Sequence, residues 1–600
     1  MVSFQMYNLS KPNSILLETN RFDKDNYRSL AFIDPARVIS CYKEKDVQKT
    51  LLELEEYINK GYYAAGYISY EAGFAFEDAL KGLDKGSTFP LLWFGIYKKP
   101  VILQDKNMDL SKSKRLPYKI SNLRLNSSHK KYIDNVKKIK NFIRRGDTYQ
   151  VNYTFKYKFD FRGSAQGLYQ DLREKQSVSY SAFINTGDSS ILSLSPELFF
   201  RKDKSLIEVR PMKGTFDRGI NIEQDRRNMK ALEQSLKNRS ENVMIVDLLR
   251  NDLGRVSMPG TVRTRKLFEV ERYETLFQMI SIVKARLKKD VGLCDLFKAI
   301  FPSGSVTGAP KISTMKIISL LEKEPRNIYT GSIGFFEPDG KAVFNVAIRT
   351  VLIDNKTRKA EMGVGSGIVI DSDPEKEFEE CKLKTNFLTQ AKKDFKLIET
   401  MLWQPQKGYF LLRHHLKRLF SSADYFDFKY DKNRVEKELK RLEKSLKDNY
   451  QYRIRVLLAR GGELESSFSR LDRGAEIEKV RFSEKKTSSS SVFFYHKTTI
   501  RDLYDKELKK WRRQGYFDIM FTNEKNQITE GAISNIIIKK GRFYYTPPLS
   551  CGLLDGVYRR YLLDSRKIPL KEKILYKKDI KNADEIYMIN SVRGMVKAVL

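Results

Sequence analysis

The most regular alternation of apolar and polar residues in the chain covers residues 151–161, VNYTFKYKFDF. The apolar positions are Val151, Tyr153, Phe155, Tyr157, Phe159 and Phe161, and the polar ones between them are Asn152, Thr154, Lys156, Lys158 and Asp160. Successive side chains of a strand point to opposite faces of its sheet. The pattern therefore predicts a long, half-buried strand in an antiparallel sheet.

Other stretches predict a mixture of strands and helices. YAAGYISYEA (63–72) and LLWFGIY (91–97) read as strands. Ser372, Asp373 and Pro374 form a helix start, with a capping side chain followed by proline in the first turn. The helix that follows is expected to end near Lys393. Its buried side is predicted to carry Phe378, Cys381, Leu388 and Ala391.

The length and texture of the chain predict two large domains. Six hundred residues exceed one ordinary domain, and 41% hydrophobic residues suffice for sizeable cores. The residue pattern changes at about Leu397 without a Gly, Ser or Pro linker. We therefore expect one domain over residues 1–393 and a second over 397–600.

The net charge of +36, from 111 Lys+Arg against 75 Asp+Glu, first suggests a nucleic-acid binder. The basic residues, however, alternate with acids along the chain, as in DKELKKWRRQG (505–515), which favours a lysine-rich solvated surface that steers small acidic ligands. No apolar run approaches the roughly 18 residues of a membrane helix, and no secretory signal is visible. The four cysteines are scattered, with no CxxC pair. We expect a soluble cytoplasmic protein that binds neither nucleic acid nor a membrane.

Several acids in the first 393 residues could hold a metal ion. Glu377 and Glu380 lie three apart on a predicted helix, so they share a face. Glu241 lies in a second segment with helical spacing. Two helices that each present a glutamate could bind one Mg²⁺, which takes few protein carboxylates and leaves places for a substrate. Solvated, salt-bridged acids are the alternative.

Two glycine-bearing loops accompany these acids. In FPSGSVTGAPK (301–311), small residues precede Pro310 and an apolar-periodic helix, whose free N–H groups suit an anion. The glycines of GVGSGIV (363–369) would let backbone amides approach a ligand closely. An ordinary turn is the alternative for each loop.

Taken together, these segments resemble the chorismate-utilising enzymes, a family that includes anthranilate, aminodeoxychorismate, isochorismate and salicylate synthases. The resemblance covers about residues 10–393. Its motifs are LLET (16–19), GYISYEAG (66–73), GDTYQVNYT (146–154), SPELF, RPMKGT, RSENVMIVDLLRNDLGRV, FPSGSVTGAPK, YTGSIGFF (329–336), IRT (348–350) and GVGSGIV. It implies an α/β (α+β) fold, a two-layer sandwich with large antiparallel sheets.

The resemblance also implies roles for individual residues. Glu241 and Glu380 would be Mg²⁺ ligands with Glu377 close by, the ion holding the C1 carboxylate of chorismate. Glu197 would be the general acid on the departing C4 hydroxyl, which requires a raised pKa. The residues implied for carboxylate binding and orientation are Arg349, Tyr329, Thr307, Gly365, Ser366 and Gly367.

Lys213 in RPMKGT indicates the branch of the family. Aminodeoxychorismate synthases have lysine at this position and anthranilate synthases have a small residue. The lysine is implied to attack C2 of chorismate, after which ammonia enters at C4 and the lysine leaves. Burial beside Arg210 is expected to lower its pKa, whereas pairing with a carboxylate is the structural alternative. The sequence departs from many relatives at Phe277 and Gln278, where they have a histidine-containing segment.

The second half contains the residue types of a pyridoxal phosphate site: Lys497 for a Schiff base, Glu530 for a ring nitrogen, and the glycine loop CGLLDGVYRR (551–560) for a phosphate. HHLKRL (414–419), HKTTIR, ITEGAISNI, GLLDGVYR and MINSVRG resemble the class IV (fold-type IV) enzymes, which include aminotransferases and aminodeoxychorismate lyase. The resemblance implies that the phosphate is held by Arg418, Gly556, Val557 and Ser591. Arg501 and Arg593 are candidates for substrate carboxylates.

This half departs from the family at its start, where relatives usually have about 25 more residues before the ET of LIETM (397–401). Either the first domain supplies the missing edge, or the domain is truncated and its lyase activity reduced.

The two halves together imply that chorismate and ammonia give 4-amino-4-deoxychorismate, and that loss of pyruvate then gives 4-aminobenzoate, the folate precursor. No cysteine lies in a plausible amidotransferase nucleophile turn, so ammonia is expected from a separate glutamine amidotransferase subunit. One alternative is an anthranilate synthase component I fused to a general class IV aminotransferase. Another is a basic nucleic-acid-binding protein built on inactive enzyme domains.

Overall fold

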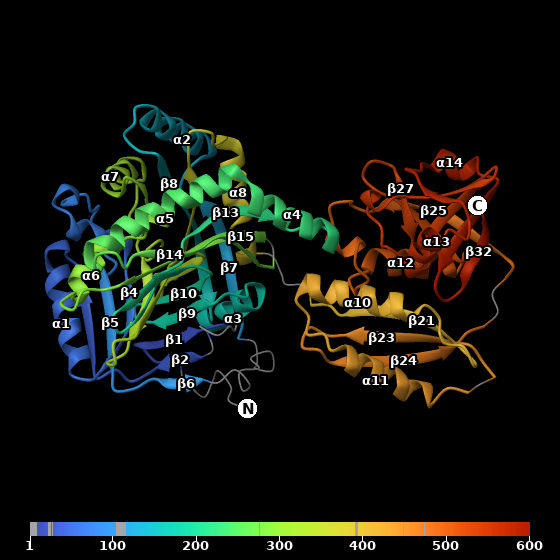
Figure 1. The fold of residues 1–600 in the computed structure, drawn as a ribbon, viewed down its shortest axis with the longest axis horizontal. Helices are drawn as coiled ribbons and strands as arrows, with labels where there is room; N and C mark the ends of the chain where they lie inside the picture. The colour runs from blue at the N-terminus through green and yellow to red at the C-terminus, as the bar shows by residue number, and fades with distance from the viewer. Residues whose placement is uncertain are drawn as a thin grey trace. The chain divides into compact units, whose positions relative to one another are not determined.

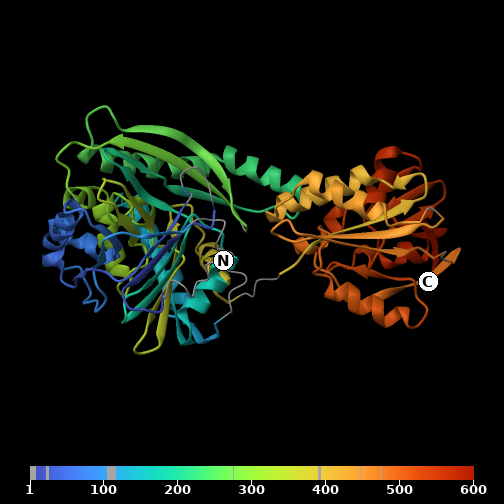
Figure 2. The ribbon, with the colours of Figure 1, turned by 90° about the horizontal axis from the view of Figure 1, so that it is seen from below.

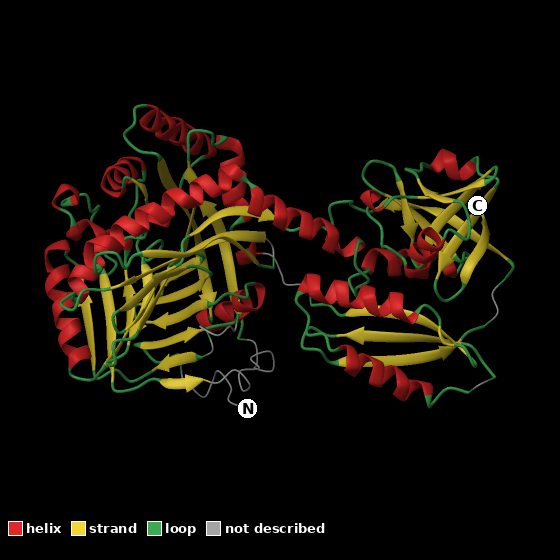
Figure 3. Cartoon of the chain, in the orientation of Figure 1, coloured by secondary structure: helices red, strands yellow, loops and turns green. Residues whose placement is uncertain are grey.

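The structure is a computed structural model that describes residues 9–21, 26, 28–103, 116–274, 276–389, 394–447, 449–472 and 475–600. The chain divides into two compact units, shown in Figures 1 and 3. The first contains residues 1–217 and 229–392, and the second contains residues 218–228 and 393–600. Each unit mixes helices and strands, and each is described by itself.

The described part of the first unit contains two ten-stranded sheets in which every strand pair is antiparallel. In spatial order, sheet A consists of β16 (Gly308–Ala309), β8 (Gln150–Gly163), β20 (Lys359–Ile368), β19 (Thr350–Asp354), β10 (Ser189–Ser195), β9 (Tyr180–Asn185), β1 (Ser14–Glu18), β2 (Ser29–Phe32) and β6 (Val101–Leu103), with β7 (Tyr118–Leu125) also beside β8. Sheet B consists of β13 (Met212–Asp217), β15 (Leu276–Arg286), β12 (Leu206–Val209), β11 (Leu198–Asp203), β18 (Ala342–Val346), β17 (Ser332–Phe336), β4 (Tyr63–Ile68), β5 (Leu92–Tyr97) and β3 (Arg37–Cys41), with β14 (Arg263–Arg272) also beside β15. The β14–β15 hairpin is the long green pair in Figure 2.

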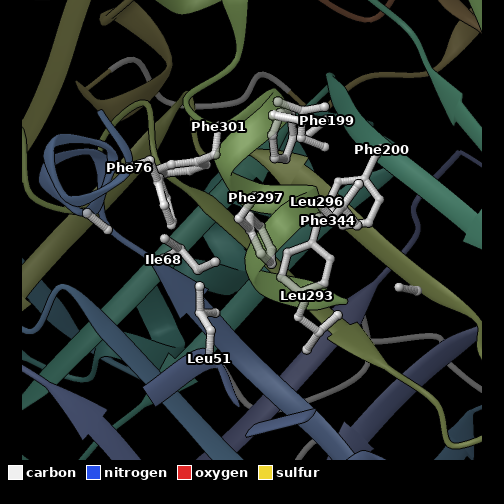
Figure 4. Packing of buried hydrophobic residues seen from close by; sticks show 14 of the residues in the cluster. Leu51, Ile68, Phe76, Phe199, Phe200, Leu293, Leu296, Phe297, Phe301 and Phe344 are labelled. Atoms are coloured by element: carbon white, nitrogen blue, oxygen red, sulfur yellow. The ribbon is translucent and has the colours of Figure 1, made fainter. Parts of the chain in front are cut away.

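The two sheets pack face to face. Ile15 and Ile184 of sheet A share a buried cluster with Tyr67 and Phe335 of sheet B. Helices cover the outer faces: α1 (Val47–Asn59), α2 (His129–Arg144), α3 (Ala165–Lys175), α5 (Leu236–Val256), α6 (Leu293–Ile300), α7 (Lys311–Leu321), α8 (Pro374–Leu383) and α9 (Asn386–Thr389). Figure 4 shows Phe297 of α6 among the phenylalanines of sheet B. The predicted fold class, a sandwich of large antiparallel sheets, is confirmed.

The alternating segment 151–161 is the greater part of β8, which pairs antiparallel with β20 and β7 as predicted. The prediction that one face lies in water is wrong for the first half of the strand. Asn152, Thr154 and Lys156 are all buried. Buried polar groups need partners, and here the Lys156 ammonium lies 2.6 Å from Glu361 and the Thr154 N–H donates to Glu322.

The capped helix begins as predicted, because the Asp373 carboxylate accepts the N–H groups of Glu375 and Lys376. It ends earlier than expected, at Leu383, and α9 follows after a break. Phe378, Cys381 and Leu388 are buried as predicted, whereas Ala391 lies outside the described residues.

The second unit contains a four-stranded and an eight-stranded sheet within the described residues. The first consists of β22 (Gly408–Tyr409), β21 (Leu397–Gln404), β23 (Tyr452–Leu458) and β24 (Leu464–Arg470). The second consists of β27 (Ile528–Gly531), β26 (Asp518–Thr522), β25 (Ile477–Lys486), β32 (Gly594–Val599), β31 (Glu585–Asn590), β28 (Asn535–Lys540), β29 (Phe543–Thr546) and β30 (Leu570–Glu572). Its helices are α10 (Leu412–Phe426), α11 (Lys432–Glu443), α12 (Asp502–Arg512), α13 (Val557–Ser565) and α14 (Lys577–Lys581), and α4 (Ile222–Gln234) begins in this unit.

Helices α10 and α11 pack on one face of the four-stranded sheet, where Leu419 and Leu439 meet Ile454 of β23. The sheet therefore has a covered apolar face and forms a small subdomain. Among the helices described in either unit, none combines the length and apolar character needed to cross a bilayer.

Candidate active sites

Lys213 lies where a strand of sheet B meets two strands of sheet A. Its Nζ atom donates a hydrogen bond to Oδ1 of Asn152 on β8, at 3.2 Å. A Cβ atom on Gly367 of β20 would lie 3.0 Å from the same Nζ. Asn152 in turn donates through Nδ2 to the carbonyl of Thr307. The structure thus brings together Lys213, Gly367 and the Thr307 loop.

The pKa of Lys213 is lowered, mainly because burial penalises the charged ammonium, and the Lys384 charge contributes further. The carboxylates of Glu241 and Glu197 oppose this shift. The sequence predicted that burial and a neighbouring Arg210 would lower this pKa, and burial is indeed the leading cause, whereas Arg210 is not among the causes. The Arg210 guanidinium pairs with Glu208.

Glu197 follows β10 and is 4% exposed. Burial raises the pKa of Glu197 to about 7, although a Ser305 hydrogen bond and the Lys213 charge favour the ionised form. A carboxyl group that holds its proton near neutral pH can act as a general acid. Its environment therefore suits the predicted role.

The three candidate metal ligands face one region without forming a closed cluster. Burial raises the pKa of Glu241, and the nearby carboxylates of Glu377 and Glu380 raise it further. Glu380 lies 2.8 Å from the Lys384 ammonium, and Glu377 accepts the Ser372 hydroxyl. Within the described residues, no group of three metal-ligating side chains is close enough to hold an ion. The carboxylate donors and their mutual repulsion fit Mg²⁺ chemically, since a divalent cation would relieve that repulsion.

The outer edge of β20 is not paired with β19 over its last residues. The ladder between β19 and β20 ends at Met362, so Gly365, Ser366 and Gly367 lie beyond it while β8 continues on the other edge. The Tyr329 ring packs against this strand, because a Cβ on Gly363 would lie 2.1 Å from it. Close packing of this kind requires glycine.

The side chains of Thr307 and Arg349, both predicted to bind substrate, hydrogen-bond to other residues of the protein. The Thr307 hydroxyl donates to Ser303 O at 3.0 Å within its own loop. The Arg349 guanidinium donates to Gln176 and lies near Tyr273.

Three residues near Lys213 were missed from the sequence: Gln150, Asn152 and Lys384. Asn152 lies on the face of β8 that was assigned to solvent, and Gln150 lies two residues before it, outside the predicted segment. Both polar side-chain atoms of Gln150 are buried without a partner among the described residues, and Nε2 would lie 2.4 Å from a Cβ on Gly367. The available signal for Lys384 was its position four residues after Glu380 on the helix.

In the second unit, Lys497 carries an amine suited to nucleophilic chemistry. Burial lowers the pKa of Lys497 to about 7, and the charges of Arg501 and Arg418 lower it further. Arg501 donates to the carbonyl of Ala532 at 2.8 Å. An amine that is neutral near pH 7 can attack a carbonyl.

Glu530, at the end of β27, is 5% exposed and is held at both oxygens. Tyr504 donates to Oε1 at 3.0 Å, and Asn535 donates to Oε2 at 3.2 Å. Burial raises the pKa of Glu530 to about 8, although a backbone hydrogen bond at Leu554, the Tyr504 hydroxyl and the Lys497 charge oppose the shift. In its ionised form, a carboxylate held in this way could accept a hydrogen bond from a protonated ring nitrogen.

The predicted phosphate site combines a cation with a helix start. Arg418 forms a bidentate ion pair with Glu399 and also faces the carbonyl of Asp555. Helix α13 begins at Val557, and its first N–H groups have no partner within the helix. A Cβ on Gly556 would lie 1.8 Å from Asn535 Oδ1, so the cradle needs glycine.

The two remaining candidates, Ser591 and Arg593, contact other parts of the second unit. The Ser591 hydroxyl donates to the carbonyl of Thr400. Arg593 is exposed and lies over the Phe517 ring. A neutral amine, a buried carboxyl, a cation and a free helix start nevertheless form a donor set that fits pyridoxal phosphate.

Comparison with known families matches each unit separately. Residues 13–390 match the family model described as chorismate binding enzyme, and residues 396–599 match amino-transferase class IV. A class IV domain implies pyridoxal phosphate as cofactor.

Curated relatives match the first half. Aminodeoxychorismate synthase component 1 of Klebsiella aerogenes is 34% identical over 342 residues, which cover 54% of this chain and 75% of that protein. The chloroplastic aminodeoxychorismate synthase of Arabidopsis thaliana is 41% identical over 273 residues, 45% of this chain. That alignment spans only 29% of the Arabidopsis protein, well under two thirds of its length.

A solved structure supports the fold of the first unit. Anthranilate synthase component I from Streptococcus pneumoniae superposes with a TM-score of 0.53 at 25% identity, covering 62% of this chain and 94% of that one.

Proposed function

Because the chain belongs to the chorismate binding enzyme family and carries a class IV amino-transferase domain after it, we propose that it performs two consecutive reactions. The first unit converts chorismate and ammonia to 4-amino-4-deoxychorismate. The second unit then removes pyruvate to give 4-aminobenzoate.

In the first reaction, Lys213 is the nucleophile. Its neutral Nζ attacks C2 of chorismate, both double bonds of the ring shift toward C4, and the C4–O bond breaks. Glu197 donates its proton, so the leaving group departs as water rather than as hydroxide. Ammonia then forms the C4–N bond, the Nζ–C2 bond breaks, and Glu197 can recover a proton from the incoming ammonia.

Glu241, Glu377 and Glu380 would hold Mg²⁺, which supplies charge stabilisation for the substrate's ring carboxylate. The amides of Gly365 and Gly367 on the open edge of β20 would orient the same substrate.

In the second reaction, the chain's residues bind and orient the cofactor and move one proton. When bound, pyridoxal phosphate supplies an electron sink that acidifies the C–H beside the substrate's amine. Lys497 would remove that proton, the bond between the ring and the enolpyruvyl oxygen would break, and the ring would become aromatic. The departing group would take up a proton and leave as pyruvate. Glu530 would keep the ring nitrogen protonated, and Arg418 and the start of α13 would hold the phosphate.

The placement of Lys213 is the observation that supports this branch most strongly. A half-buried lysine beside Asn152 and Gly367, with Glu197 and Glu241 contributing to its electrostatic environment, combines a nucleophile and an acid in one site.

Mass spectrometry of chorismate reactions tests the proposal. The purified chain with Mg²⁺ and ammonium is expected to form aminodeoxychorismate, and Lys213→Ala is expected to lose this activity. Formation of anthranilate, or an unchanged rate in the variant, would overturn the proposal.

The first reaction needs a source of ammonia, and both reactions need a cellular compartment. Ammonia would come from a separate glutamine amidotransferase subunit, and both reactions would take place in the cytoplasm. All four cysteines lie in the described part of the chain and are free, which suits a reducing compartment.

A further inference from the structure

Glu530 is held by two side chains from different elements, and the proposed reaction does not otherwise use either. The Tyr504 hydroxyl reaches it from α12, and the Asn535 amide reaches it from the start of β28. An ionised carboxylate only accepts hydrogen bonds. Two donors, one on each oxygen, therefore suit Glu530 in its charged form.

Tyr504 has little freedom to move away from this contact. Its side chain is buried, 7% exposed, and its ring packs against those of Phe494 and Phe521 with centroids 5.5 and 4.8 Å away. The hydroxyl is thus directed at Glu530 by packing.

Asn535 connects Glu530 to the proposed phosphate site. Its Nδ2 group also donates to the carbonyl of Leu554, at 2.9 Å, which fixes the orientation of the amide. The opposite atom, Oδ1, faces Gly556 at the start of α13. The same amide therefore aligns the carboxylate and the helix start.

A second buried carboxylate shapes the turn that follows Glu530. Asp518 is 0% exposed and accepts the N–H groups of Ala532 and Ile533 at 2.8 and 3.3 Å. A Cβ on Gly531 would lie 2.4 Å from its Oδ2 atom. The turn wraps closely around Asp518, so the backbone that carries Glu530 is also fixed.

We propose that Tyr504 is a positioning residue that keeps Glu530 ionised and directed at the pyridine nitrogen of the bound cofactor. This inference rests on the proposed pyridoxal phosphate function of the second unit. The physical reason is that a buried carboxylate stays charged only where hydrogen bonds replace the lost water. Without the Tyr504 hydroxyl, Glu530 would retain its own proton more readily and would hold the proton on the ring nitrogen less well.

The test is ¹⁵N NMR of the full-length chain loaded with ring-¹⁵N pyridoxal phosphate, because the ¹⁵N shift reports protonation of that nitrogen. Tyr504→Phe removes one oxygen atom and keeps the ring packing. Tyr495→Phe is the matched control. Tyr495 is also 7% exposed, and its hydroxyl donates at 2.8 Å to the carbonyl of Ser489 rather than to Glu530.

We expect the ¹⁵N signal of wild type and Tyr495→Phe at the protonated position, and that of Tyr504→Phe moved toward neutral pyridine. Lyase turnover of Tyr504→Phe should fall about ten- to a hundred-fold, the range for losing a hydrogen bond to a charged group. An unchanged ¹⁵N signal in Tyr504→Phe overturns the inference, and so does an equal change in Tyr495→Phe.

Glu530→Gln distinguishes a failure of the Tyr504 role from a failure of the proposed cofactor function. If it moves the ¹⁵N signal and Tyr504→Phe does not, the role of Tyr504 is wrong while that of Glu530 stands. If Glu530→Gln leaves the signal unchanged, or the chain fails to bind the cofactor, the proposed function of the second unit fails and this inference fails with it. Thermal unfolding of each variant identifies any loss of fold.

Discussion

At the scale of single residues, the central features are two lysine amines whose pKa values are lowered. Lys213 and Lys497 both lose affinity for their protons mainly because the ammonium is removed from water. Glu197 shows the complementary effect, since burial makes this carboxyl hold its proton more tightly.

Substitution of Lys213 by alanine should abolish the first reaction alone. We expect aminodeoxychorismate formation from ammonium to fall more than about a hundredfold, because the nucleophile is lost. Conversion of supplied aminodeoxychorismate to 4-aminobenzoate should remain, as an internal control for folding. A matching loss of both activities would indicate a damaged fold instead of a missing nucleophile.

The pH dependence of the first reaction should reflect Glu197. An acid must be protonated to donate, so kcat/KM should decline as pH rises through about 7, the pKa of Glu197. Lys213 must be neutral to attack, so activity should also decline toward acid pH. Glu197→Gln should be slow and should lack the alkaline decline that begins near pH 7. Retention of that decline in the variant would assign it to another group.

At the scale of elements, each site is assembled from strand faces and helix starts. Residues on β8, β13 and β20 meet at Lys213, and β27, β28 and α12 meet at Glu530. Helix starts contribute at α8, which carries two candidate metal ligands, and at α13.

The cap of α8 offers a direct test of that arrangement. Asp373→Ala removes the side chain that accepts two N–H groups, and should lower the free energy of unfolding by about 1 kcal/mol. Since α8 carries Glu377 and Glu380, the Mg²⁺ concentration for half-maximal activity should rise. Asp339→Ala, at an exposed turn, is the control that should change neither quantity. Unfolding at the same urea concentration as wild type would contradict the role of the cap.

The start of α13 can be tested in the same way. Gly556→Ala places a Cβ against Asn535, so affinity for pyridoxal phosphate should fall about tenfold or more. Gly541→Ala is the control, because a Cβ there would meet no other atom. Its backbone has a positive φ, so this substitution adds some strain of its own. Equilibrium titration of the apoprotein measures the effect, and equal affinity in wild type and Gly556→Ala would exclude close packing at this cradle.

Features of the fold that depend on local patterns could be predicted from the sequence, and features that depend on distant residues could not. The antiparallel sheets and the start of α8 were predictable, because side-chain alternation and capping are local. The burial of both faces of β8 was not. Asn152 and Lys156 look solvated in sequence, and their partners Lys213 and Glu361 lie far along the chain.

The residues of the candidate sites differ in the same way, since motifs identify some of them and only the fold identifies others. Lys213, Glu197, Lys497 and Glu530 could be named from motifs, and in the structure the two glutamates are buried and the two lysines half-buried. Tyr504 could not, because only packing against α12's neighbours directs its hydroxyl at Glu530. The break after Leu383 likewise followed no visible signal in the sequence.

At the scale of the whole molecule, two units with separate cores carry consecutive steps of one proposed route. Covalent linkage raises the local concentration of the intermediate without requiring a channel. The ammonia source is expected to be outside the chain, so ammonium should support slow synthesis and glutamine alone should not. Glutamine-driven turnover by the isolated chain would contradict this expectation.

The most direct test of the whole account is identification by mass spectrometry of the products from chorismate, Mg²⁺, ammonium and pyridoxal phosphate. We expect 4-aminobenzoate and pyruvate from the wild-type chain, and accumulation of aminodeoxychorismate from Lys497→Ala. Anthranilate as the aromatic product, or 4-aminobenzoate at the wild-type rate from Lys497→Ala, would contradict it.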